Sequence, residues 1–260
     1  MRTTGSVLAV VPARAGSKGI PGKNLRTVGG RSLVRRAVES ARRATRIDQV
    51  VVTTDGDAIA AEAVAAGAAV VRRPAELAGD EASSESALLH VLDAISTPLP
   101  EVLVFLQATS PFIDPADLDA AVARVVDGHA DAVFAATQSH AFLWRSAPDG
   151  TAVAVNHDAA TRPRRQDREP EYRETGAFYV MRTAGFLENR HRFHGRVEVA
   201  VVDGAGAIDI DDEADLALAE TLAEAPGALT DAPVGAPAPA PTTTRDPSPT
   251  RATPAPNGAP

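Results

Sequence analysis

A cluster of three cations and three glycines follows the first apolar segment of the chain, residues 7–11, and we call residues 13–24 the cationic loop. The cations are Arg14, Lys18 and Lys23, and each can neutralise phosphate charge. Glycine lets the backbone approach a ligand closely, and the amides of such a loop can cradle oxyanions. The loop matches neither the Walker A pattern nor the Gly-x-Gly-x-x-Gly pattern of dinucleotide-binding proteins. The residue types alone leave two alternatives open, a phosphate-binding loop and a surface loop with solvated cations.

Two carboxylates late in the chain form a second candidate site. Asp209 and Asp211 are separated by one residue, so on a strand both side chains point to one face. Such a pair suits Mg²⁺, or Mn²⁺, because these ions take oxygen ligands and bridge phosphates. The alternative is that Asp211 or Asp212 only caps the N-terminus of the helix that follows.

The elements that must position these residues are predicted from an alternation of apolar segments and helical patterns. Strands are predicted at residues 7–11, 49–53, 68–71, 102–106, 131–136, 176–181 and 197–202. Helices are predicted at residues 33–41, 57–66, 84–95 and 212–224, and another begins at Asp114-Pro115. The alternation predicts an α/β fold with a mostly parallel, Rossmann-like sheet and helices on both faces. Ligands of such sheets bind beyond the carboxyl ends of the strands, where the cationic loop lies.

The composition of the chain excludes several classes of protein. The chain has 260 residues, 44% of them hydrophobic, which is enough for a core, and a formal net charge of −8, which argues against a nucleic-acid partner. The absence of cysteine excludes disulfides and thiolate metal sites. Because the N-terminal segment, residues 1–6, is short and polar and no long apolar segment follows it, we expect no signal peptide, no membrane span and a cytoplasmic location.

Two segments depart from the alternating pattern. Ten of the 20 prolines lie in residues 226–260, so we predict a domain at 1–224 and a disordered Pro/Ala-rich tail at 225–260. Residues 138–173 form a polar insertion that contains Arg162, Arg164, Arg165 and Arg168. An insertion of this length usually has a function, and we expect it to cover a substrate or to reach another subunit.

Four sequence blocks, in order along the chain, resemble the motifs of one family. They are Ala-Arg-x-Gly-Ser-Lys-Gly-Ile-Pro-Gly-Lys-Asn at 13–24, Arg-Pro-Ala-Glu-Leu-Ala-Gly-Asp-Glu-Ala-Ser-Ser at 73–84, Leu-Gln-Ala-Thr-Ser-Pro at 106–111 and Asp-Ile-Asp at 209–211. Together they resemble the acylneuraminate cytidylyltransferases, the CMP-sialic acid synthetases. The resemblance implies a nucleotidyltransferase sheet and a homodimer, with the insertion as the dimerisation segment. It also implies a reaction in which the anomeric hydroxyl of a nonulosonic acid attacks the α-phosphate of CTP and pyrophosphate leaves.

The resemblance also implies roles for particular residues. It assigns catalysis to Arg14, Lys23, Asp209 and Asp211, and metal binding to the last two. It assigns nucleotide binding to Arg14, Ser17, Lys18, Lys23, Asn24, Arg73, Ala82 and Ser84. It assigns sugar binding to Gln107, Tyr179 and Arg165, the last reaching the sugar carboxylate from a partner subunit, as suits a bidentate guanidinium. Each of these three residues also has an alternative interpretation. Gln107 could be a buried amide with satisfied hydrogen bonds, Tyr179 a core aromatic, and Arg165 part of a solvated basic patch.

Three departures from the family pattern leave the acceptor open. Phe112-Ile113 stand where many members have an arginine, Thr175 replaces a common asparagine, and the insertion has no lysine. The alternatives are therefore another acidic acceptor, such as a Kdo-like sugar or a phosphonate. A more distant alternative is a dinucleotide-dependent oxidoreductase, for which Asp55 is the one candidate ribose-binding acid. The last is a binding protein whose Pro-rich tail docks a partner.

Overall fold

The computed structural model describes residues 6–17, 19–79, 82–95, 98–204 and 207–224. The strands of its main sheet are β1 (Val7–Pro12), β4 (Gln49–Thr54), β5 (Ala69–Arg72), β6 (Val102–Leu106), β7 (Ala132–Ser139), β10 (Glu171–Arg182) and β11 (Val197–Val201). The helices are α1 (Leu33–Arg43), α2 (Asp57–Ala65), α3 (Ser84–Ala94), α4 (Pro115–Val126), α5 (Thr183–Asn189) and α6 (Glu213–Ala223), with short 3₁₀ helices η1 (Lys23–Leu25), η2 (Ala75–Leu77) and η3 (Arg165–Asp167).

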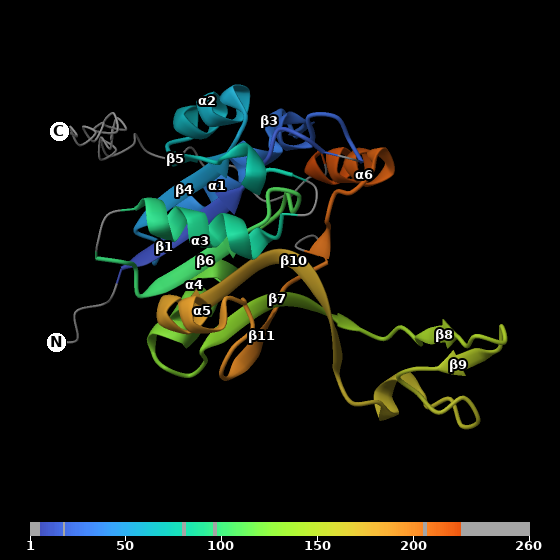
Figure 1. Cartoon of the computed structure of the whole chain (residues 1–260). Helices are drawn as coiled ribbons and strands as arrows, with labels where there is room; N and C mark the ends of the chain where they lie inside the picture. The colour runs from blue at the N-terminus through green and yellow to red at the C-terminus, as the bar shows by residue number, and fades with distance from the viewer. Residues whose placement is uncertain (1–5, 18, 80–81, 96–97, 205–206, 225–260) are drawn as a thin grey trace, which may run out of the picture.

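The centre of the fold is a seven-stranded sheet in the order β11-β7-β10-β6-β1-β4-β5 (Figure 1). Strand β10 runs antiparallel to both of its neighbours, β6 and β7, and the other pairs in the sheet are parallel. The predicted mostly parallel α/β fold is therefore confirmed. No helix in the described ranges is long and apolar enough to cross a membrane.

Both faces of the sheet are covered by helices because its central strands are apolar on both sides. In β1, Val7, Ala9 and Val11 pack into the core under α1, α2 and α4. The alternate residues Leu8 and Val10 pack into the core under α3 and α5, the helices that face the viewer in Figure 1. The prediction of helices on both faces is confirmed.

A third apolar cluster joins the cationic loop to the C-terminal part of the described chain. Its buried members are Ile20, Val28, Leu33, Phe112, Ile210, Leu216 and Ala219. Ile20 belongs to the cationic loop, Ile210 lies between the two candidate metal-binding aspartates, and Leu216 belongs to α6. The cluster therefore holds the predicted phosphate-binding loop against the Asp-Ile-Asp segment, although the two lie about 190 residues apart in the sequence.

The predicted strands and helices are all present, with boundaries that differ by a few residues. The largest difference is in β10, which begins at Glu171 where the pattern predicted residue 176. The structure adds α5 and a hairpin of two short strands, β2 (Thr27–Val28) and β3 (Arg31–Ser32). The predicted tail, residues 225–260, lies outside the described residues, so the domain boundary stays a prediction.

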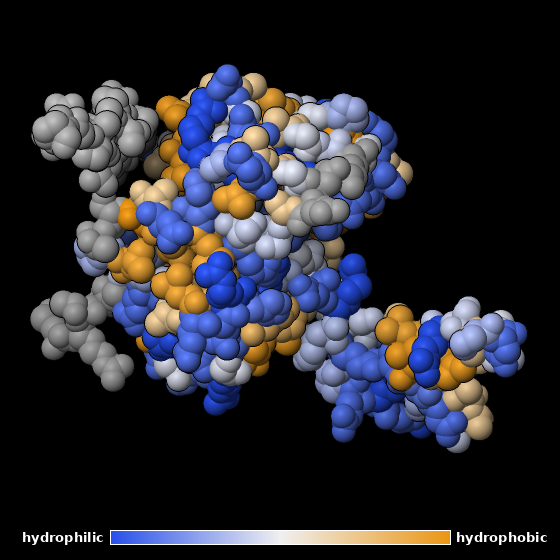
Figure 2. Space-filling view, in the orientation of Figure 1, coloured by the Kyte–Doolittle hydropathy of each residue, from blue (hydrophilic) through white to orange (hydrophobic). Residues whose placement is uncertain are grey.

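The insertion forms an arm that projects from the body of the molecule (Figure 1). It contains an antiparallel hairpin of β8 (Trp144–Ser146) and β9 (Ala152–Ala154), and η3. The guanidinium groups of Arg162 and Arg168 lie 4.7 and 4.5 Å from the ring centroid of Phe142. Leu143, Val153 and Val155 form an exposed apolar patch on one face of the hairpin, and Trp144 is exposed on its other face; apolar surface on the arm is visible in Figure 2.

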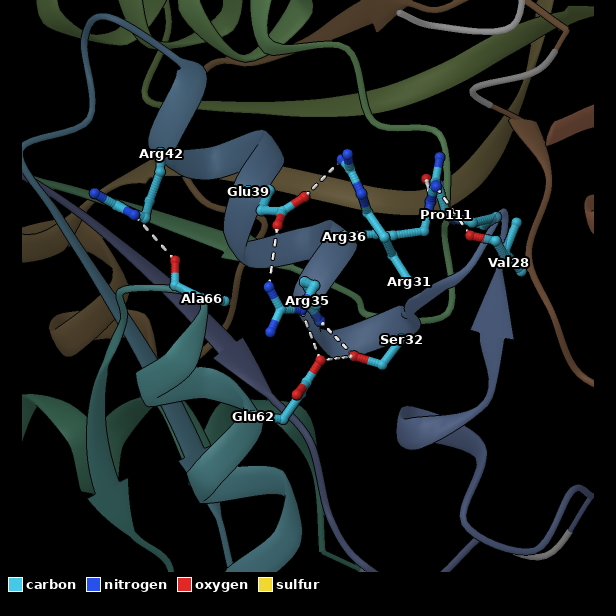
Figure 3. Close-up of polar contacts among 10 residues, drawn as sticks. All are labelled: Val28, Arg31, Ser32, Arg35, Arg36, Glu39, Arg42, Glu62, Ala66 and Pro111. Atoms are coloured by element: carbon cyan, nitrogen blue, oxygen red, sulfur yellow. Dashed lines mark hydrogen bonds and ion pairs between the residues drawn. The ribbon is translucent and has the colours of Figure 1, made fainter. Parts of the chain in front are cut away.

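Buried Arg36 ties α1 to β2 and to the loop that contains Pro111 (Figure 3). Its Nε donates to the carbonyl of Pro111 at 2.8 Å, and its Nη1 donates to the carbonyl of Val28 at 3.0 Å. The guanidinium also lies 5.2 Å from the ring centroid of Phe112. Phe112, a departure from the family pattern, is therefore a core residue that packs under Arg36.

We expect Glu62→Gln to lower stability by about 0.5–1 kcal/mol at neutral pH, because both partners are partly solvent-screened. Glu62 accepts hydrogen bonds from Arg35 and Ser32, at 2.7 and 2.8 Å, and the Arg35 bond lowers its pKa (Figure 3). Because the pKa of Glu62 is lower in the folded state, its carboxylate stabilises the fold at pH values above the unfolded-state pKa of 4.5. This stabilisation is lost as the pH falls through the folded-state pKa. Melting curves of wild type and variant should therefore converge at acid pH. Glu224→Gln, at an exposed helix end, is the control, and parallel curves at all pH values would contradict the assignment.

Candidate active site

A pocket of about 400 Å³ lies at the carboxyl ends of β1 and β6. Its lining includes predicted site residues from all four sequence blocks: Arg14, Ser17, Lys23, Asn24, Arg73, Ala82, Ser84, Gln107 and Asp211. Lys18 lies outside the described residues. The structure therefore brings together residues that the sequence separates by almost 200 positions, at the sheet edge where open α/β folds bind ligands.

The ammonium group of Lys23 is fixed at the pocket by the Asp-Ile-Asp segment. Its Nζ donates to the carbonyl of Ile210 at 2.7 Å and lies 3.2 Å from Oδ1 of Asp211. The Lys23 side chain is only 14% exposed. Asn24 follows it and donates from Nδ2 to the carbonyl of Arg14 at 2.9 Å, so its amide braces the loop. The ammonium group of Lys23 thus has a defined position on the pocket wall.

The Asp-Ile-Asp segment is not a strand, so the alternation of side chains along a strand does not apply to it. No strand pairs with it in the described chain, and its main chain is held by hydrogen bonds from Ile210 N to Thr109 O at 2.9 Å and from Asp211 N to Asp215 Oδ2 at 3.0 Å. Ile210 points into the third apolar cluster, and Asp211 lines the pocket with an 80% exposed side chain. Asp212 is the residue that caps α6, accepting from the amides of Ala214 and Asp215. Capping therefore does not explain Asp209 or Asp211.

Asp209 is half-buried beside the pocket. Its Oδ1 is buried and has no hydrogen-bond partner among the described residues. Burial raises the pKa of Asp209 above its ordinary value, a hydrogen bond with Thr109 opposes this, and the charge of Asp211 adds to the rise. The described chain holds no group of three or more acidic or histidine side chains suited to a metal. Two carboxylates with open ligand capacity fit Mg²⁺, which commonly takes one or two carboxylates together with substrate phosphates.

Gln107 lies between the pocket and the bend in β10. Its main-chain N–H donates to the carbonyl of Ala177 at 3.1 Å. The β10 register shifts between Glu174 and Tyr179, and Gly176 in this stretch has φ +79°. A Cβ built on Gly176 would lie 3.0 Å from Oε1 of Gln107 and 3.7 Å from Oδ2 of Asp209. The glycine therefore leaves space for both functional side chains.

Tyr179 lies behind the pocket wall. It is 4% exposed, and its ring stacks on Phe105, which lines the pocket, with centroids 5.3 Å apart. Its hydroxyl donates to Glu174, and burial raises its pKa. The structure thus agrees with the core interpretation of Tyr179, and direct contact with a sugar stays a prediction.

Arg192 and Glu85 lie behind the pocket lining with Tyr179, and no sequence pattern predicted them. The Arg192 guanidinium lies 4.5 Å from the Tyr179 ring centroid and 4.9 Å from that of Phe105. Its Nε donates to Oε1 of Glu85 at 2.7 Å, in the first turn of α3 next to Ser84. No sequence motif contains Arg192, so only its fold-dependent neighbours reveal it.

Arg165 is not part of the pocket within one chain. It is exposed and lies in η3 on the projecting arm (Figure 1). Its predicted action across a subunit boundary stays a prediction.

We expect Gly176→Ala to destabilise the protein by about 1–2 kcal/mol, because an L side chain is strained in the left-handed region. The new Cβ would also press on Gln107 Oε1, 3.0 Å away, so the KM for the acceptor should rise more than the KM for the nucleotide. Thermal melting and steady-state kinetics test this. Gly204→Ala is the control, since nothing lies within 4 Å of its added Cβ. Equal changes in both variants would contradict the assignment.

Comparison with known proteins identifies the family. The cytidylyltransferase family model matches residues 8–202. N-acylneuraminate cytidylyltransferase of Oncorhynchus mykiss is 36% identical over 67% of this chain and 40% of its own length. CMP-N,N'-diacetyllegionaminic acid synthase of Legionella pneumophila is 30% identical over 84% of this chain and 96% of its own length. The chain spans between 40% and 52% of the length of the first four curated relatives that it matches.

A solved structure supports the fold. CMP:2-keto-3-deoxy-manno-octonic acid synthetase complexed with CTP aligns with a TM-score of 0.64 at 17% identity, over 84% of this chain and 98% of that protein. At this identity the likeness concerns the fold alone. The family model, in contrast, covers most of the described chain, including the first three sequence blocks. This chain belongs to the cytidylyltransferase family.

Proposed function

We propose that this chain transfers CMP from CTP to the anomeric hydroxyl of a nonulosonic acid and releases pyrophosphate. The observation that carries the proposal is the convergence of the four sequence blocks on one pocket, with Arg14, Lys23 and Arg73 among its lining residues. Relatives named for N-acylneuraminate and for N,N'-diacetyllegionaminic acid, both nonulosonic acids, support this class of acceptor.

In the proposed reaction the acceptor oxygen bonds to the α-phosphorus of CTP, the bond from that phosphorus to the pyrophosphate oxygen breaks, and the proton of the acceptor hydroxyl is released to solvent. Negative charge on the phosphoryl oxygens is the feature that the protein must stabilise. Arg14 and Lys23, together with Lys18 and the loop residue Ser17, would hold the triphosphate. Because Lys23 is held by Ile210 and Asp211, its charge is oriented before the substrate arrives.

The carboxylates of Asp209 and Asp211 would hold a magnesium or manganese ion. When bound, such an ion would supply positive charge that stabilises the pyrophosphate leaving group. The unpartnered, buried Oδ1 of Asp209 supports this assignment, since a divalent cation would offset the cost of burying the carboxylate.

The remaining residues of the pocket would bind the cytosine base and the acceptor. Arg73, Ala82 and Ser84 would surround the cytidine, and Gln107 would donate to the acceptor sugar. Arg165 of a second copy would meet the acceptor carboxylate in a homodimer joined through the arm, whose exposed apolar patch suits a subunit contact. Light scattering tests the dimer. The cytoplasmic location stays a prediction that cell fractionation tests.

Pyrophosphate release from CTP and Mg²⁺ tests the reaction. The acceptor panel contains sialic acid, its deaminated analogue Kdn, legionaminic and pseudaminic acids, Kdo and a phosphonate. We expect release with one or more of the nine-carbon acids, and none when ATP, GTP or UTP replaces CTP. If only Kdo or the phosphonate gives release, the proposed class of acceptor is wrong, but the proposed transfer of CMP from CTP still holds. Absence of release with every acceptor would overturn the proposal.

A further inference from the structure

The carboxyl end of β4 holds the cationic loop on both sides of Arg14. We call residues 53–56 the β4 tip. The amide of Ala13 donates to the carbonyl of Thr53 at 3.0 Å, and the amide of Ala15 donates to Oδ1 of Asp55 at 2.8 Å. The two residues that flank Arg14 are therefore both anchored to the β4 tip.

Packing reinforces this attachment. A Cβ built on Gly56 would lie 3.1 Å from the Cβ of Ala15, so loop and tip are in close contact. The tip itself is well ordered by its own contacts, since the amide of Gly56 donates to Oγ1 of Thr54 at 3.1 Å. Thr53 and Thr54 are both fully buried. The loop therefore rests on a rigid part of the sheet.

The same tip also fixes Arg73, another cation of the pocket. The Arg73 amide donates to the carbonyl of Thr54 at 2.9 Å, and its Nη2 donates to the carbonyl of Thr53 at 2.7 Å. Burial lowers the pKa of Arg73, the charge of Asp55 opposes this, and the charge of Arg14 adds to the lowering. Asp55 is thus a negative charge next to two cations that repel each other.

We propose that Asp55 is a positioning residue that holds the cationic loop in the arrangement that receives a nucleoside triphosphate. This role rests on the proposed function. Asp55 carries out no chemical step, because it acts through the amide of Ala15. Its Oδ1 is engaged by the loop, which differs from the ribose-binding acid that a dinucleotide-dependent enzyme requires.

Limited trypsin digestion of the full chain without substrate measures how accessible the cationic loop is to cleavage. Cleavage after Arg14, Lys18 and Lys23 is followed by mass spectrometry. Loss of one hydrogen bond should make cleavage about fivefold faster in Asp55→Ala. Asp55→Asn retains an acceptor oxygen, so its cleavage rate should stay within about twofold of wild type. Asp57→Ala is the matched control, since Asp57 pairs with Arg72 on the surface at 2.6 Å and is 95% exposed.

Kinetics provide the second readout. In Asp55→Ala the KM for CTP should rise about fivefold, while the KM for the acceptor and the melting temperature stay near wild type. If that variant does not fold, Gly56→Ala replaces it, because its Cβ displaces Ala15 without removing the carboxylate. Wild-type cleavage and wild-type KM in the folded variant would overturn the proposal. Faster cleavage in a chain that never turns over CTP would contradict the proposed function and leave the positioning role intact.

Discussion

Replacing Lys23 by methionine is expected to lower kcat for pyrophosphate release by about 10²- to 10³-fold, the usual cost of removing one pre-oriented transition-state contact. The Lys23 side chain is 14% exposed, and its Nζ is held by Ile210 O and Asp211 Oδ1. A fixed, partly desolvated cation stabilises developing phosphate charge more than a mobile surface lysine does. Steady-state kinetics with saturating CTP measure the effect.

The control for Lys23 is Arg26→Met in the neighbouring stretch of chain. Arg26 pairs with Glu213 at 2.7 Å, but the two side chains are 41% and 62% exposed and neither lines the pocket. Loss of this cation should change kcat less than about twofold, as expected for a surface ion pair. Equal losses in the two variants would mean that general charge, and not the position of Lys23, matters for turnover.

The fold could be predicted where burial leaves a strong pattern. Strands β1 and β6 are buried on both faces, so each is a continuous apolar segment in the sequence. Helix α5 has only seven residues, too few for a helical period to stand out, and β2 and β3 have two residues each. The first half of β10 is polar and exposed, so its pairing with β7 left no hydrophobic signal.

The candidate site shows a similar division. Arg14, Lys23, Arg73 and Asp211 could be predicted because residue type and motif mark them, and the structure brings them to one pocket. The Arg192–Glu85 pair could not, since it joins residues 107 positions apart with no motif around Arg192. The contacts of the β4 tip are mainly to backbone atoms, which almost any sequence supplies. Sequence motifs therefore indicate the candidate site residues, and only the fold shows the contacts that position their side chains.

Replacing Asp209 by asparagine should separate activity from stability. We expect kcat to fall by about 10²- to 10³-fold, because the carboxylate would hold the ion whose charge would stabilise the leaving group. Burial raises the pKa of Asp209, and its Oδ1 has no partner among the described residues, so the charged form is unfavourable in the fold without a cation. The variant should consequently melt at the same or a higher temperature than wild type when divalent cations are absent. Melting with EDTA, and kinetics across a Mg²⁺ series, measure the two effects.

Asp212→Asn is the matched control, because Asp212 caps α6 and asparagine caps a helix N-terminus about as well as aspartate does. This variant should retain both activity and melting temperature. Addition of Mg²⁺ and CTP should raise the melting temperature of wild type and of Asp212→Asn, and should raise that of Asp209→Asn much less. If Asp209→Asn instead melts well below wild type in EDTA and keeps its kcat, the carboxylate is structural. The acidic segment would then serve to hold Lys23 and α6, and the cation would have to bind through the substrate alone.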